Sequence, residues 1–182
     1  MEDALENTLH VIAIWCHILG IALFVGPQFF LAFAWVPAAR GIADQRIRAD
    51  LTRKLTRRFG WIGGIGLLMI VIAGGYLIAR WRDYYAYPSG AGFTEIWYGV
   101  LFIIKMNLLI LMLIVVGLHT FYVGPKLVDA IDAEVAGTGS AAQTRRARML
   151  SMAFSIVGLL LTLGIMVFGV MLNTSGISFA AT

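Results

Sequence analysis

Four long apolar runs constrain this chain more than any other feature of its sequence. They cover about residues 8–38, 59–80, 96–124 and 149–173, and each reaches the roughly 20 residues that a helix needs to cross a bilayer. Only 13% of the 182 residues are charged and the mean hydropathy is +0.85, whereas soluble domains carry about 25% charged residues. We therefore predict an all-α integral membrane protein, a four-helix bundle whose residues 1–182 form one transmembrane domain.

The basic residues are distributed unevenly around these runs. Of the 14 Lys and Arg residues, seven lie between the first and second runs, four between the third and fourth, and two between the second and third. Cytoplasmic loops are enriched in Lys and Arg, so we expect both termini outside. The pattern predicts a multi-pass protein of the cell inner membrane, in contact with the lipid bilayer. Topology accounts for the net charge of +4, and we predict no nucleic-acid partner.

An internal repeat is suggested by matches at an offset of 88 residues. Pro37 falls on Pro125, Phe33 on Phe121, and Thr56-Arg57-Arg58 on Thr144-Arg145-Arg146. The same offset puts His17 opposite Lys105. A duplicated helix pair would explain these matches, and so would chance. If the pair is duplicated, His17 and Lys105 lie at the same depth on parallel helices.

Ionisable residues inside the apolar runs are the candidates for function. His10 and His17, seven residues apart, share one helix face at a separation of about 10.5 Å. Counting along the helices places His17 and Lys105 about 13 Å below the outer boundary, and His119 in the inner half. A Lys at the centre of a membrane helix costs roughly 2.5 to 3.5 kcal/mol. Structural roles are the alternative: an interfacial His10, a snorkelling Lys105, and a His119 bonded to a backbone carbonyl.

Two kinds of metal chemistry could use such residues. A haem b needs an axial imidazole, a slot between helices and polar groups for its propionates, and the glycines at 60–66 and 74–75 leave part of the second helix without side chains. The Gly60 and Gly64 pair is also typical of close helix packing, which is the more ordinary use of such a face. Copper would use Cys16, His17 and methionines. His10 and His17 are the candidate metal ligands in either case.

Three segments resemble the broad group that contains the HemJ-type membrane protoporphyrinogen oxidases and the CopD-type copper-resistance membrane proteins. They read "LHVIAIWCHILGIALFVG" (9–26), "RRFGWIGGIGLLMIVIAGGYLI" (57–78) and "IIKMNLLILMLIVVGLHTFYVGPKL" (103–127). His10, Arg58, Lys105 and His119 occupy positions of the HemJ-type pattern. The resemblance implies a haem b or porphyrin site in which His10 is the iron ligand and Lys105 lies in the same pocket.

The chain departs from the HemJ-type pattern in two ways. The interval from Lys105 to His119 is longer, and His17 is an additional histidine. The CopD-type pattern, in contrast, is matched from His17 to Gly26, so copper remains an alternative cofactor. Depth favours His17 as the ligand and the resemblance favours His10, and the sequence leaves both open.

These observations lead to one principal prediction and two alternatives. The principal one is a membrane haem b protein, working in electron transfer or as an oxidoreductase on porphyrins, with a quinone or porphyrin as partner. His10, His17, Lys105 and His119 are its candidate cofactor-binding residues, and Lys105 and Arg58 its candidate catalytic residues. The alternatives are a CopD-like copper permease and an accessory subunit of a larger membrane complex. We expect a homo-oligomer or a subunit of such a complex.

Overall fold

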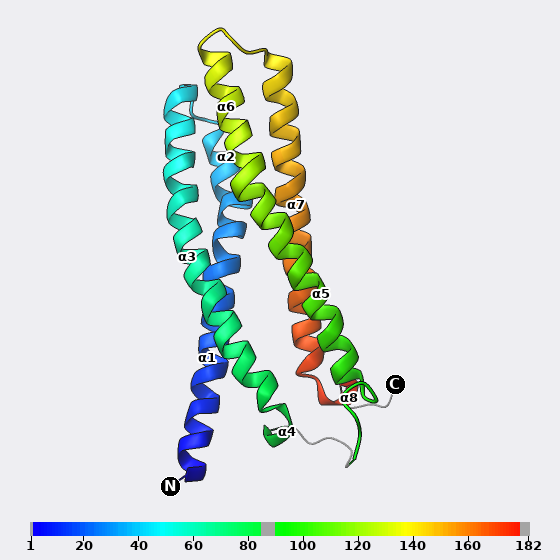
Figure 1. The fold of residues 1–182 in the computed structure, drawn as a ribbon. Helices are drawn as coiled ribbons and strands as arrows, with labels where there is room; N and C mark the ends of the chain where they lie inside the picture. The colour runs from blue at the N-terminus through cyan, green and yellow to red at the C-terminus, as the bar shows by residue number, and fades with distance from the viewer. Residues whose placement is uncertain (1, 85–89, 179–182) are drawn as a thin grey trace. The chain divides into compact units, whose positions relative to one another are not determined.

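The computed structural model describes residues 2–84 and 90–178, and these residues form helices without a strand (Figure 1). Four helical stretches are long and apolar enough to cross a membrane: Ala4–Ala39, Arg46–Ala79, Trp97–Val135 and Ala141–Leu172. The predictions of an all-α fold and of four spans are confirmed, and the chain is a multi-pass membrane protein in a lipid environment. The placement of both termini outside stays a prediction.

The chain divides into two compact units, Met1–Tyr85 and Ala86–Thr182. Each unit contains two of the four long helices, joined at one end, and is therefore a helical hairpin. The single domain over 1–182 stays a prediction.

The first hairpin pairs two long helices. Its elements are α1 (Glu2–Phe29), the π-helix η1 (Phe30–Trp35), α2 (Val36–Ala39), α3 (Gln45–Ala79) and α4 (Trp81–Tyr84). α1 and α3 run antiparallel, side by side along most of their length (Figure 1). α3 begins 14 residues before the apolar run at 59, because the Asp44 carboxylate accepts hydrogen bonds from the amides of Arg46 and Ile47 at 2.8 and 3.2 Å.

Glycines bring α1 and α3 together at their crossing. A Cβ placed at Gly66 would lie 2.7 Å from the Gly20 carbonyl oxygen, and one at Gly20 would lie 2.7 Å from the Gly66 carbonyl oxygen. Neither position has room for a side chain, so the two backbones are in direct contact. The expectation for Gly60 and Gly64 does not hold within this hairpin, because a Cβ at either would meet nothing within 4 Å.

Polar contacts connect the two ends of the α1–α3 pair. At one end, Arg80 Nη1 donates to Glu6 Oε1 at 3.1 Å and to Asp83 Oδ2 at 3.2 Å. The carboxylates of Asp83 and Glu6 raise the pKa of the Arg80 guanidinium. At the other end, the indole of Trp35 donates to the Thr52 hydroxyl at 3.1 Å. These contacts fix the register in which the face of α1 meets α3.

The second hairpin has the same order of elements. They are α5 (Trp97–Leu118), the π-helix η2 (His119–Val123), α6 (Gly124–Val135), α7 (Ala141–Leu172) and α8 (Ser175–Ser178). α5 packs along α7, and α6 continues beside the first part of α7 (Figure 1). α7 begins at Ala141, eight residues before the apolar run at 149, and the Ser140 side chain caps its N-terminus.

The two π-helices recur at the offset of 88 residues. The Val36 amide donates to the Leu31 carbonyl in η1, and the Gly124 amide donates to the His119 carbonyl in η2. A proline follows each of these amides and lacks the N–H that would continue the α-helical ladder, so one turn widens to an i to i+5 bond. The shared irregularity supports the duplication of a helix pair, which the sequence left open against chance.

Candidate functional site

His17 lies on the face of α1 that packs against α3. Its Nδ1 atom is 3.2 Å from the carbonyl oxygen of Ile70. A carbonyl oxygen only accepts hydrogen bonds, so Nδ1 carries the proton and Nε2 of the neutral ring has the lone pair. A histidine that ligates a metal is commonly oriented by such a bond from its other ring nitrogen. The first hairpin therefore presents one imidazole in the tautomer that a ligand requires.

Gly74 provides the space for this imidazole. A Cβ at Gly74 would lie 3.1 Å from Cε1 and 3.4 Å from Nδ1 of His17, while a Cβ at the neighbouring Gly75 would meet nothing within 4 Å. The ring thus lies over a glycine one turn beyond Ile70, the residue to which it bonds. The sequence did not single out this contact, because it joins residues 57 positions apart.

His10 lies on the same face of α1, seven residues before His17. Its Nδ1 atom is buried. Glu6, one turn earlier, pairs with α3 through Arg80, so this face meets α3 on both sides of His10. The predicted sharing of one face by the two histidines agrees with these contacts.

Arg58 is exposed on α3, 12 residues before Ile70. This interval corresponds to about 18 Å along the helix axis. The structure therefore does not bring Arg58 to the imidazole of His17 within the first hairpin.

Lys105 occupies the corresponding place in the second hairpin. A Cβ at Gly169 of α7 would lie 3.7 Å from Lys105 Nζ and 4.0 Å from Cε. Gly169 is in the last turn of α7, where carbonyl groups lack intrahelical partners and the helix dipole favours a cation. In the described part of the chain, the ammonium group has no hydrogen bond and no ion pair.

The two positions are equivalent within their hairpins. Lys105 follows His17 by 88 residues, and Gly169 follows Gly74 by 95. α6 has 12 residues and α2 has four, and this difference accounts for the larger second offset to within one residue. In each hairpin an ionisable side chain of the first long helix thus lies against a glycine near the end of the second.

His119 forms a separate polar cluster at the start of η2. Its Nε2 atom is 3.1 Å from the Ser151 hydroxyl and 3.4 Å from the Ser155 hydroxyl of α7. The sequence did not indicate these side-chain partners. His119 is 14 residues beyond Lys105, about 21 Å along the helix, so the second hairpin does not bring the two together.

Over residues 2–84 and 90–178, no group of three or more His, Cys, Asp and Glu residues is placed to hold a metal ion. Comparison with known protein families, curated proteins and solved structures finds no match to this chain. The resemblance to the HemJ-type and CopD-type groups stays a prediction.

Proposed function

We propose that the chain is a haem b-binding membrane protein that works in electron transfer or in porphyrin oxidation, with His17 as the axial ligand. The observation that carries this proposal is the hydrogen bond from His17 Nδ1 to the Ile70 carbonyl. This bond orients the ring, and Nε2 is the ring nitrogen that would bind the haem iron. One oriented imidazole would be enough to hold a haem b.

Each residue of this site has a distinct role in the proposal. Bound haem supplies one-electron chemistry. Ile70 orients the ring through its carbonyl, and Gly74 leaves the ring the room to reach it. His10 is about 10.5 Å from His17 along the helix, too far to bind the same iron, so it serves as a polar partner such as a propionate donor. The electron partner in this proposal is a quinone or a porphyrin.

The test is spectroscopic and uses the full chain purified in detergent from haem-replete cells. We expect a b-type α band in the dithionite-reduced spectrum and a positive pyridine haemochrome assay. His17→Ala should lose the haem, because it removes the axial ligand. His119→Ala should retain it and is the matched control with one imidazole removed, whereas His10→Ala should weaken haem retention without abolishing it, because it removes a polar partner of the haem.

Each of the other outcomes would contradict the haem proposal and favour a different alternative. A folded wild-type protein without haem would refute it, and copper binding by that preparation would favour the copper permease. Co-purification with a larger complex, without haem or copper, would favour the accessory subunit. If His10→Ala lost the haem and His17→Ala retained it, the iron ligand would be His10 and not His17.

A further inference from the structure

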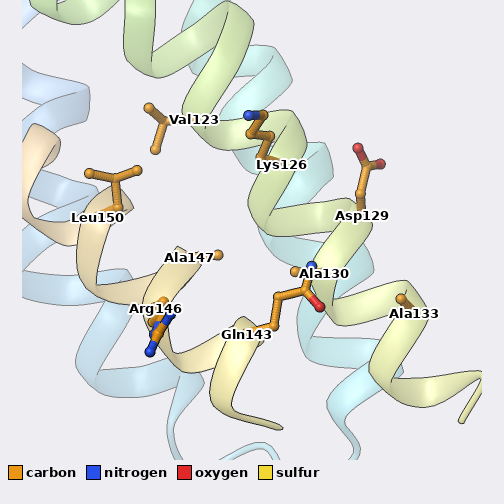
Figure 2. A pocket seen from close by; sticks show the side chains of 9 residues that line it. All are labelled: Val123, Lys126, Asp129, Ala130, Ala133, Gln143, Arg146, Ala147 and Leu150. Atoms are coloured by element: carbon orange, nitrogen blue, oxygen red, sulfur yellow. The ribbon is translucent and has the colours of Figure 1, made fainter. Parts of the chain in front are cut away.

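A cleft of about 540 Å³ lies between α6 and α7 in the second hairpin (Figure 2). Its polar lining consists of Lys126, Asp129, Gln143 and Arg146, and the rest of the lining is apolar. Figure 2 shows Val123 and Leu150 at one end of the cleft, and Ala133 and Gln143 toward the other. The cleft therefore combines charged groups with an apolar surface, as a site for an amphiphile requires.

The cleft lies where the membrane-spanning part of the second hairpin ends. Residues 106–125 contain no Asp, Glu, Lys or Arg, and this stretch stops directly before Lys126. On the other helix, Arg148 is the last charged residue, and no charged residue follows it. The apolar stretches of both helices therefore end beside the cleft. The charged groups of the cleft thus fall at the level of lipid headgroups.

The cations of the cleft suit a phosphate group. Arg146 has no hydrogen bond or ion pair among the residues that the structure describes, and its planar guanidinium can hold two phosphate oxygens at once. Lys126 Nζ donates to the Tyr122 hydroxyl at 2.6 Å and lies 4.0 Å from the centre of the Tyr122 ring. These contacts restrain one Lys126 donor and leave its ammonium two further donors.

The carboxylate of Asp129 limits which phosphate-containing headgroups the cleft can bind. Two cations and one carboxylate give the lining a net charge of +1, which balances the single negative charge of a phosphodiester. A carboxylate only accepts hydrogen bonds, so Asp129 requires donors on the bound headgroup. The glycerol hydroxyls of a phosphatidylglycerol-type headgroup supply them.

We propose that the cleft between α6 and α7 binds an anionic phospholipid, with Arg146 and Lys126 on its phosphodiester, Asp129 on its headgroup hydroxyls and the apolar lining along its glycerol backbone. Basic pockets between membrane helices bind anionic headgroups in this way. The site is independent of the haem proposal, and either can fail without the other.

Native mass spectrometry of the full chain in detergent tests this site, with phosphatidylglycerol or phosphatidylcholine added. The wild type should retain one phosphatidylglycerol molecule in preference to phosphatidylcholine. Arg146→Gln should weaken that binding about tenfold, because a charge-assisted bond is lost. Arg146→Lys should restore only part of it, since an ammonium cannot form the two parallel bonds.

Arg145→Gln and Arg148→Gln are the matched controls. Both change the same charge on the same exposed turns of α7, and neither residue lines the cleft. We expect both variants to bind like the wild type. If Arg145→Gln and Arg146→Gln weakened phosphatidylglycerol binding equally, the lipid would be attracted by the overall positive charge and not by the cleft, and the proposal would be overturned.

A competition with inorganic phosphate distinguishes the source of the phosphate group. Retention of phosphatidylglycerol in millimolar phosphate supports a lipid site. Displacement of the lipid would show a site for free phosphate and overturn the proposal, as would equal retention of phosphatidylcholine. Circular dichroism of each variant should show unchanged helicity, and Asp129→Asn should reduce the preference for phosphatidylglycerol over phosphatidic acid.

Discussion

The two hairpins have the same order of elements but hold their helices together differently. In the first, the backbones of Gly20 and Gly66 touch. In the second, buried Met112 of α5 takes part in the packing, and a Cβ at Gly158 would lie an ordinary 3.8 Å from Val116. The first pair of helices therefore depends on missing side chains and the second on side-chain packing.

The difference in helix packing agrees with the kind of ionisable residue in each hairpin, His17 in the first and Lys105 in the second. The close crossing brings the α3 backbone within reach of a short, rigid imidazole, so His17 can bond to the Ile70 carbonyl. In the second hairpin the end of the Lys105 side chain, Cε and Nζ, lies near Gly169 of α7 instead. A short ring can bond to the backbone of a neighbouring helix only where that backbone is close, whereas a long flexible side chain can reach a helix that is farther away.

The largest expected effect comes from filling the glycine crossing. Gly66→Ala puts a methyl group 2.7 Å from the Gly20 carbonyl oxygen, so the backbones must separate. We expect a loss of about 1 to 3 kcal/mol in the free energy of unfolding, measured by denaturation in detergent. Gly64→Ala on the same helix is the control and should be neutral or stabilising. If the two variants were equally stable, the first hairpin would not depend on the backbone contact at Gly20 and Gly66.

An intermediate effect is expected at the imidazole. Gly74→Ala places a methyl group 3.1 Å from His17 Cε1 and should displace the ring from Ile70, at a cost of about 1 kcal/mol. Nitrogen NMR of labelled histidine should show a protonated Nδ1 in the wild type and a mixture of tautomers in the variant. Gly75→Ala should leave the wild-type signal unchanged. A wild-type ring protonated only at Nε2 would contradict the hydrogen bond and the proposed ligand atom.

The smallest effect is expected at the equivalent glycine of the second hairpin. Gly169→Ala brings a methyl group to 3.7 Å from Lys105 Nζ, an ordinary van der Waals contact. The unfolding free energy should change by less than about 0.5 kcal/mol, and thermal denaturation beside Gly74→Ala measures the difference. A loss as large as that of Gly66→Ala would mean that both hairpins are packed equally tightly.

The spans were predictable from sequence, and the ends of the helices were not. Apolar runs mark the part of a helix that lies in lipid. However, α3 and α7 begin before their apolar runs, in stretches that contain charged residues. Their starts depend on local caps at Asp44 and Ser140, which hydropathy does not register. The Gly60 and Gly64 pair failed as a packing signal because α3 has glycines on several faces, and spacing alone does not say which face meets α1.

The candidate site was predictable only in part. Depth along the helix identified His17 and Lys105 as unusual, because charge and polarity are costly inside a bilayer. Their neighbours Ile70, Gly74 and Gly169 required the three-dimensional pairing of helices. The 88-residue offset could not reveal Gly169, since the longer α6 moves it to an offset of 95.

The two π-helices bear on how the two halves of the chain are related. In both halves a π turn precedes a proline, and the two turns occupy equivalent positions, Leu31 to Val36 and His119 to Gly124. Duplication of a single hairpin that already had the proline and the π turn would explain both. On that account one ancestral position became His17 in the first half and Lys105 in the second, whereas the π turn was kept in both halves.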